Sequence, residues 1–455
     1  MTLKVLKFGG SSVGSPEALR RAAAIIRDEL PAGGLVVVSA LKGTTDAILA
    51  AAAAAGQGEI EKARQLQKAI RLRHEAVARE LALLEAVEPD WRELFERLSN
   101  LLDGMGLLGE ATPRSRDAAL AVGETLSARL VAALLAARGA RFRDVRAVLR
   151  TDGRFGHARP DLPGLRQAAR TWRAELLDGA LLITQGFIGE DPYGATTTLG
   201  RGGSDTSATL LGEALSASEV QIWTDVDGVL SADPSLVPEA RPLPVMSLAE
   251  ATALSAFGAK VLHADSLAPL ARAGFRLLVA NTLRPEASRT LILPAPPLRA
   301  PGEVTSVAYK EGLTLLRLPA GTRLDEILQH ASALDEAGAR RFGLLANPEG
   351  ALLALLSETP GAEARLAALE AEGFELQRGW AVVALVGEGL RQDPGAALRL
   401  LAALHHEPIG GLLTGSSGVS VAFLVPEARL PDLIPSLHAA CIAGAVHDLQ
   451  TTEAP

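Results

Sequence analysis

The sequence predicts an α/β protein in which a sheet of parallel strands is followed by smaller α+β modules. The chain opens with a strand, a glycine-rich loop, a helix, a second strand and a second helix. Short aliphatic strands then recur at the spacing of alternating strands and helices, and a proline-rich stretch after Leu293 precedes further strands. Ligands of such sheets bind at the carboxyl ends of the strands, so we expect the site there.

The individual elements follow from aliphatic runs, glycine breaks and capping residues. Ser15 is a candidate N-cap, because Pro16 and Glu17 suit a first helical turn. The expected strands are Leu3–Phe8, Leu35–Val38, Leu181–Ile183, Gln221–Thr224, Leu277–Val279, Thr314–Leu318, Ala351–Leu356, Ala381–Val386 and Val419–Val425. The expected helices are Pro16 to about Leu30, Thr44–Ala55, Ala118–Ala137, Thr206–Ala217, Ala362–Ala371 and Gly395–Leu404.

The segment Glu59–Leu108 is charged, rich in alanine and leucine and nearly free of glycine, which predicts two or more helices. A partner-binding coiled coil would need a sustained heptad, and none occurs. We therefore expect a helical insertion, around residues 57–110, that packs on the α/β core.

Bulk composition narrows the class of protein. A chain of 455 residues predicts two or three domains, and 48% hydrophobic with 22% charged residues is typical of a globular protein with a sizeable core. The net charge of −8 argues against a nucleic-acid surface and against binding to an anionic membrane. A single cysteine, Cys441, excludes an internal disulfide and a multi-cysteine zinc site, and fits a reducing compartment.

Two segments bear on localisation. Met1–Phe8 has the pattern of a strand, so we expect no signal peptide. Pro408–Pro426 lacks charges, but its glycines, serines and bounding prolines suit turns and a strand, not a membrane span. The expectation is a cytoplasmic protein.

The stretch Thr196–Asp205 contains three glycines, an arginine and a Ser-Asp pair directly before an expected helix. Glycine lets backbone N–H groups approach an anion, and a helix N-terminus favours negative charge. Arg201 adds a planar fork for a carboxylate, with about 1.5–3 kcal/mol per charged hydrogen bond. A plain strand-to-helix turn would use the same glycines, and the stretch alone does not separate the two.

Several blocks, in this order, resemble the signatures of aspartate kinases and cover most of Leu3–Leu293. They are Lys7–Val13 (KFGGSSV), Val122–Ser127, Arg150–Pro160, Thr184–Gly189, Thr196–Asp205, Trp223–Val229 and Phe257–His263. The resemblance implies an amino-acid-kinase-like three-layer α/β/α sandwich over residues 1–293. A linker at 294–303 and a C-terminal pair of ACT-like (ferredoxin-like) α+β domains, at 304–378 and 379–455, would follow.

For the nucleotide, the resemblance implies that Lys7 and Lys260 hold the phosphates of ATP while Asp205 orients this cationic cluster. Phosphoryl transfer needs such cations around the transferred group. The sequence contains neither a P-loop nor the protein-kinase motifs, and Lys7 alone could be an ordinary surface lysine. The implied nucleotide contacts are Lys7, Gly9, Gly10, Ser39, Thr224, Asp225, Leu230, Ser235, Lys260 and Val261.

Mg²⁺ on the phosphates would offset the remaining charge, with no dedicated metal ligands in the protein. The pair Asp225 and Asp227 also fits a direct metal role, but the resemblance favours nucleotide contact through Thr224 and Asp225. Family members usually carry a tyrosine and an arginine where this chain has Leu230 and Ser235. We expect the loss of that arginine to weaken ATP binding.

For the acceptor, the resemblance assigns the carboxylate of aspartate to Arg201 and Ser204, with Gly202 and Gly203 beside them. It assigns the ammonium group to Glu124 and a further contact to Thr45. Glu124 alone could equally be a solvated helix carboxylate. No general base is expected, because a carboxylate nucleophile with a pKa of ~3.9 is already ionised at neutral pH. The histidines show no metal-ligand spacing, and we expect His263 to be structural.

The implied reaction is phosphorylation of L-aspartate to 4-phospho-L-aspartate, the entry to lysine, threonine and methionine biosynthesis. Alternatives are a related kinase for glutamate, N-acetylglutamate or aminoadipate, and a catalytically weak regulatory protein. Gly415–Val421 matches the second ACT-like domain, whereas Arg340–Leu356 lacks the usual effector segment of the first. These domains are expected to form a homodimer, and either to bind lysine or threonine or to serve mainly as the interface.

Overall fold

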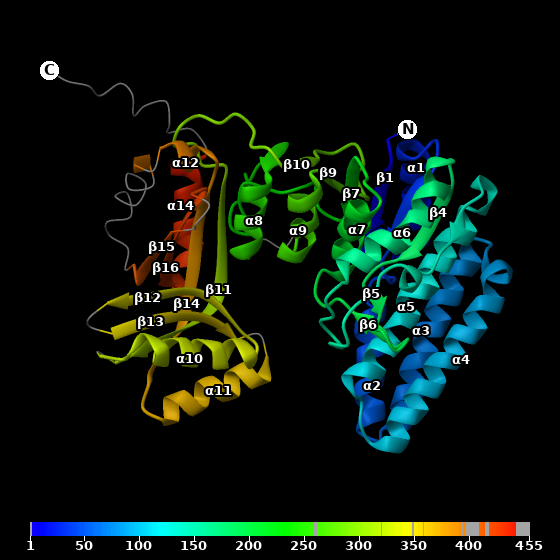
Figure 1. The fold of residues 1–455 in the computed structure, drawn as a ribbon, viewed down its shortest axis with the longest axis horizontal. Helices are drawn as coiled ribbons and strands as arrows, with labels where there is room; N and C mark the ends of the chain where they lie inside the picture. Colours follow the sequence, from blue (N-terminus) through cyan, green and yellow to red (C-terminus); the bar gives the residue numbers. More distant parts are fainter. Residues whose placement is uncertain are drawn as a thin grey trace. The chain divides into compact units, whose positions relative to one another are not determined.

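A computed structural model describes residues 2–258, 262–319, 321–347, 350–357, 359–393, 395–396, 409–414 and 418–442. The chain forms two compact units (Figure 1). The first comprises Met1–Val229, Pro244–Leu248 and Val261–Ala295, and the second comprises Leu230–Leu243, Ala249–Lys260 and Pro296–Pro455.

The first unit is built on an eight-stranded sheet in the order β3-β4-β2-β1-β7-β9-β10-β8. All neighbouring strands are parallel except β9 and β10. Its strands are β1 (Lys4–Phe8), β2 (Gly34–Val38), β3 (Arg141–Phe142), β4 (Leu181–Gln185), β7 (Glu219–Thr224), β8 (Val245–Ser247), β9 (Arg276–Asn281) and β10 (Thr290–Leu293). A small hairpin of β5 (Ile188–Glu190) and β6 (Thr196–Thr198) stands apart from this sheet.

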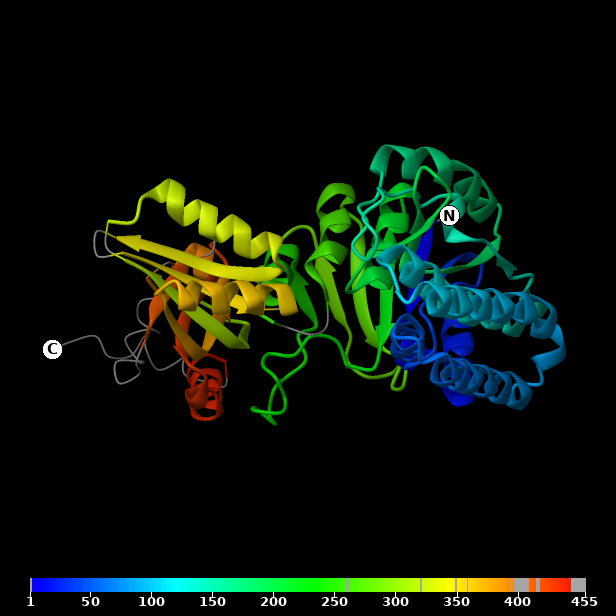
Figure 2. The ribbon, with the colours of Figure 1, turned by 90° about the horizontal axis from the view of Figure 1, so that it is seen from below.

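Helices cover both faces of this sheet, which confirms the predicted three-layer sandwich. One face buries alternate residues such as Leu6, Phe8 and Val36 against α1 to α5, and α7 packs on β1 and β2 from the other face, with α6 and α9 beside it (Figures 1 and 2). The helices are α1 (Pro16–Glu29), α2 (Thr44–Gly56), α3 (Ile60–Glu80), α4 (Leu84–Leu108), α5 (Pro113–Leu134), α6 (Leu162–Leu177), α7 (Gly203–Ala214) and α9 (Ala264–Ala273).

Several local predictions can be compared directly with these elements. The Ser15 hydroxyl accepts the N–H of Ala18 at 3.2 Å, so it caps α1 as predicted. The segment predicted to be helical around residues 57–110 forms the paired helices α3 and α4. Helix α5 begins earlier than predicted, at Pro113, because Thr112 accepts the N–H of Ser115 and caps it.

The second unit is built on a six-stranded antiparallel sheet in the order β12-β13-β11-β14-β16-β15. Helices α10 and α11 pack side by side on it, around the buried Leu316, Leu353 and Leu366 (Figure 1). The elements are β11 (Ser306–Leu318), α10 (Leu324–Glu336), β12 (Ala339–Asn347), β13 (Gly350–Ser357), α11 (Pro360–Ala371), β14 (Glu375–Val386), α12 (Gly389–Gln392), β15 (Gly411–Thr414), β16 (Ser420–Pro426) and α14 (Leu430–Cys441). The expected helix Gly395–Leu404 lies largely outside the described residues, as do Gly415–Ser417.

The division of the chain differs from the predicted boundary at 293. Leu230–Leu243 belongs to the second unit because Ala232 and Val237 enter its core beside β14 and β16. Ser231 Oγ also pairs with His438 Nε2 at 2.8 Å. The predicted division between residues 378 and 379 falls inside the continuous strand β14, so the two expected ACT-like domains share one sheet.

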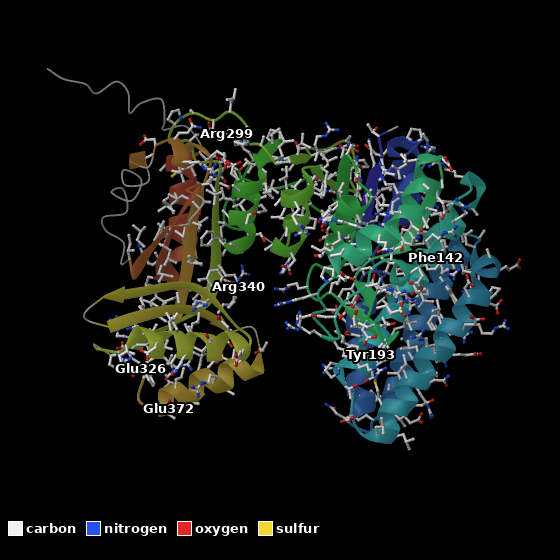
Figure 3. All side chains as sticks on the ribbon, viewed as in Figure 1. Phe142, Tyr193, Arg299, Glu326, Arg340 and Glu372 are labelled. Atoms are coloured by element: carbon white, nitrogen blue, oxygen red, sulfur yellow. The ribbon has the colours of Figure 1, made fainter. Side chains whose placement is uncertain are left out.

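Helix α8 (Leu248–Ala256) is anchored almost entirely in the second unit. Its fully buried Glu250 accepts hydrogen bonds from Thr305 Oγ1 at 3.1 Å and from the N–H of Glu388 at 3.0 Å. Arg340 of β12, labelled in Figure 3, donates to the carbonyl of Ala256 at 3.0 Å. These contacts explain why a segment expected in the catalytic domain clusters with the six-stranded sheet.

No helix in the described part of the chain combines the length and hydropathy of a membrane span.

His74 is a buried polar residue inside the α3–α4 pair. It packs edge-on against Trp91 and Phe95, and its Nδ1 faces the carbonyl of Ile70 at 2.8 Å. Its Nε2 has no hydrogen-bond partner in the described structure. Burial lowers the pKa of His74 from 6.5 to about 4, so the imidazole is neutral in the folded protein at physiological pH.

We therefore predict that His74 makes the helical pair acid-sensitive. Because the folded pKa lies below the unfolded value, stability present above pH 6.5 is lost as the pH falls toward 4. The loss reaches about 2 kcal/mol at pH 5. Urea denaturation at pH 7.5 and 5 should show a smaller acid-induced loss for His74→Leu than for the wild type. The partly exposed His330→Leu serves as the control, and equal losses in wild type and His74→Leu would contradict the prediction.

Candidate active site

A cavity of about 360 Å³ opens in the first unit beyond the carboxyl ends of β1 and β2. It is formed by the turns after these two strands, the glycine loop before α7 and one side chain from α5. The lining residues are Lys7, Gly10, Ser39, Ala40, Leu41, Lys42, Gly43, Thr45, Asp46, Glu124, Phe187, Gly200, Arg201, Gly202, Gly203, Ser204 and Asp205. Lys7, Glu124 and Arg201, predicted from separate parts of the chain, thus line one cavity.

Lys7 and Asp205 form an ion pair at the base of this cavity. Lys7 Nζ lies 2.5 Å from Asp205 Oδ1, and both side chains are largely buried. Lys7 is on β1 and Asp205 on the first turn of α7, so the pair ties the sheet edge to the glycine loop. The predicted orienting role of Asp205 toward the phosphate-binding cations stays a prediction.

Two helices begin at the cavity, and neither has a side-chain cap. The N-cap of α2 is Gly43, with φ +77°, and that of α7 is Gly202, with φ +68°. Both angles lie in the left-handed region that favours glycine. A Cβ at Gly202 would lie 2.6 Å from Cβ of His263, which therefore packs under the loop. Uncapped helix N-termini present N–H groups and positive partial charge to an anion.

Glu124 projects from the middle of α5 into the cavity. Its Oε2 accepts the N–H of Ala40 at 2.8 Å, and the residue is only 4% exposed. Burial raises the pKa of Glu124 to about 8, although the Ala40 N–H and the charge of Lys7 both act to lower it. The side chain is therefore a neutral acid at pH 7, not a solvated helix carboxylate.

The predicted nucleotide residues at the carboxyl ends of β1, β2 and β7 lie at the same edge of the sheet. The N–H of Gly9 and the hydroxyl of Ser12 both donate to the carbonyl of Trp223 at 3.0 Å. Thr224 and Asp225 follow directly, although neither lines the cavity itself. Ser39 N–H donates to the carbonyl of Phe8 at 3.1 Å and does line it.

The acidic pair after β7 divides into two environments. Asp227 accepts from Asn281 Nδ2 at 2.6 Å and pairs with Arg284 at 2.5 Å, whereas Asp225 is exposed. Asp227 is thus occupied by protein partners. Among the described side chains, no group of three or more His, Cys, Asp or Glu residues is arranged to hold a metal ion.

Besides Gly9, Thr224 and Asp225, two further predicted nucleotide residues of the described chain do not line this cavity. Leu230 and Ser235 belong to the second unit, where Ser235 Oγ donates to Asp233 Oδ1 at 2.6 Å. Lys260 and Val261 lie outside the described residues. Their assignments stay predictions.

The cavity also contains residues that sequence reasoning missed, above all Lys42, Asp46 and Phe187. Phe187 has φ +72°, unusual for a non-glycine residue, and its N–H donates to Ser207 Oγ at 2.9 Å. Strain of this kind often accompanies a functional site. The sequence does contain a signal for Lys42. A lysine precedes a glycine near the end of each of the first two strands, as Lys7 before Gly9 at β1 and as Lys42 before Gly43 after β2.

The sequence profile of the amino acid kinase family matches residues 2–281 of this chain. Lysine-sensitive aspartokinase 3 of Escherichia coli is 33% identical over 95% of this chain and 98% of its own length. A crystal structure of E. coli aspartokinase III with aspartate and ADP, in the R-state, superposes with a TM-score of 0.83 at 32% identity, covering 96% of this chain and 99% of that one. Its T-state complex with lysine and aspartate gives a TM-score of 0.80 at 32% identity, covering 97% and 99%. The chain therefore belongs to the amino acid kinase family and, within it, to the aspartokinases.

We predict that Glu124 remains protonated at neutral pH in the free protein. The infrared difference spectrum between wild type and Glu124→Gln should contain a neutral carboxyl band at pH 7 that disappears as the pH rises through about 8. Glu213→Gln is the matched control. Burial acts to raise the pKa of Glu213, but hydrogen bonds from Arg272 and Arg166 bring it below its ordinary value. A Glu124 band already ionised at pH 6 would contradict the prediction.

Proposed function

We propose that this protein transfers the γ-phosphate of ATP to the side-chain carboxylate of L-aspartate, giving 4-phospho-L-aspartate. The observation that carries the proposal is the single cavity in which the Lys7–Asp205 pair, Arg201 and Glu124 meet. The aspartate and ADP present in the R-state E. coli structure support the same substrates for this chain.

The cavity residues fit the two ends of aspartate. Arg201 is exposed at the cavity and forms no ion pair within the described chain, so its fork is available for the α-carboxylate. Ser204 and the start of α7 add hydroxyl and N–H donors beside it. Glu124 would accept the ammonium group once it is ionised.

The reaction itself needs positioning more than proton transfer. The attacking carboxylate is ionised at neutral pH, so the site must hold two anions in line and reduce their repulsion. Lys7 and the two uncapped helix N-termini would do this. Lys260, Thr224 and Asp225 are the further proposed nucleotide contacts. Mg²⁺ would bind through the phosphates and neutralise part of their charge.

An alternative amino-acid substrate, such as glutamate or aminoadipate, would present the same α-ammonium and α-carboxylate groups on a molecule with a longer side chain. An N-acetylated amino acid is disfavoured, because it has no ammonium group to stabilise an ionised Glu124. A catalytically weak regulatory protein is disfavoured by the intact Lys7–Asp205 pair.

We predict that hydroxylamine, with ATP and Mg²⁺, traps an acyl phosphate with aspartate and gives much less product with glutamate, aminoadipate or N-acetylglutamate.

Glu124→Gln should raise the KM for aspartate about ten- to a hundredfold, as expected for loss of one charged hydrogen bond. In the wild type this KM should fall as the pH rises from 6 toward 8, because Glu124 must ionise to hold the ammonium group. The variant should lose that slope. Equal trapping with another acceptor would reject the predicted preference for aspartate, and trapping only with another acceptor would reject aspartate as the substrate.

Regulation and assembly are further parts of the proposal. The product would feed lysine, threonine and methionine biosynthesis in the cytoplasm, with a homodimer formed through the six-stranded sheet of the second unit. The name of the E. coli relative and the lysine in its T-state structure support an amino-acid effector. The segment Arg340–Leu356, which covers most of β12 and β13, departs from the usual effector pattern and argues for weak sensitivity.

We therefore predict that lysine and threonine, each added alone, inhibit the trapping assay weakly or not at all. The measurement is a titration of each amino acid to several millimolar at a fixed aspartate concentration. Strong inhibition by either one at sub-millimolar concentration would instead establish retained feedback control.

A further inference from the structure

We infer that Lys42 is an additional phosphate-binding cation of this site, positioned to contact the terminal phosphate of the nucleoside triphosphate. This inference rests on the proposed function and extends it to a residue outside the motifs that identify the family. It follows from the charges that remain available in the cavity and from what the turn after β2 touches.

The charged residues lining the cavity are Lys7, Lys42, Asp46, Glu124, Arg201 and Asp205. Lys7 is neutralised by Asp205, and burial keeps Glu124 protonated at pH 7. Arg201 and Lys42 then remain as the cations that form no ion pair within the described chain. Two anionic substrates must meet in this space, so both free cations lie where negative charge accumulates.

The position of Lys42 favours the nucleotide over the amino acid. The backbone N–H of Lys42 donates to the carbonyl of Gly10 at 3.1 Å. Gly14 also lies close to Lys42, since a Cβ added at Gly14 would be 3.1 Å from the Cβ of Lys42. The turn that carries Lys42 is therefore packed on the glycine loop after β1, the proposed phosphate loop. Arg201 lies instead beside Gly202 and Ser204, at the proposed carboxylate end.

The chemistry of the side chain agrees with this assignment. An ammonium group on a flexible stem binds phosphate as a point charge, whereas the arginine fork suits a planar carboxylate. Lys42 is exposed and lies directly before Gly43, the N-cap of α2. It therefore adds a mobile charge beside fixed N–H donors without a role in the protein core.

The test uses the full chain with Lys42→Met, Lys42→Arg and the control Lys68→Met. Lys68 is an exposed lysine on α3 that forms no ion pair within the described chain and does not line the cavity. Titration calorimetry with a non-hydrolysable ATP analogue and Mg²⁺ should show about tenfold weaker binding for Lys42→Met, with most of the affinity kept in Lys42→Arg. Lys68→Met should bind like the wild type, and all melting temperatures should agree.

In the trapping assay, Lys42→Met should lower kcat/KM for ATP about tenfold and leave the KM for aspartate within about twofold. Wild-type affinity and turnover in Lys42→Met would overturn the inference. A rise confined to the KM for aspartate would also overturn it, by assigning the cation to the amino acid. If the wild type traps no aspartyl phosphate, the proposed function fails, and the calorimetry still tests Lys42.

Discussion

The ion pair between Lys7 and Asp205 is the contact on which the site depends. Parallel β1 and β2 end at one edge of the sheet, and the pair fastens the first turn of α7 to that edge. Removing one partner of a buried pair leaves an uncompensated charge and typically costs about 3–5 kcal/mol. In the free protein Asp205 holds Lys7 in place, and incoming phosphates can compete for the same ammonium group.

The backbone supplies the rest of the positive potential. Gly43 and Gly202 adopt left-handed conformations that let α2 and α7 begin at the cavity without side-chain caps. Both N-termini therefore keep N–H groups available for anions. Because strands and helices of a packed core hold these donors, the site is ordered before the substrates arrive, which lowers the cost of bringing two anions together.

Local motifs predicted much of this site, and tertiary packing determined the remainder. Lys7, Arg201 and Glu124 were found because each lies in a recognisable block of sequence. The Lys42-Gly43 pair after β2 does not by itself predict a site, because the role of Lys42 depends on the packing of its turn against Gly10. The predicted domain boundary at residue 293 differs from the observed division for a similar reason. Leu230–Leu243 follows β7 directly in the chain, yet its apolar side chains find their core against β14 and β16.

The protonation of Glu124 is the property that links this fold to its class of substrate. A buried neutral acid is tolerated at pH 7, whereas its ionised form needs a compensating charge. In the proposed function, an α-ammonium group would supply that charge and shift the equilibrium toward the carboxylate, so binding of a free amino acid would be coupled to release of a proton. An acylated amine supplies no charge and leaves Glu124 neutral. In the proposed function, burial of one carboxyl group would thereby favour free amino acids, and Arg201, which lines the same cavity, would bind the carboxylate that accompanies them.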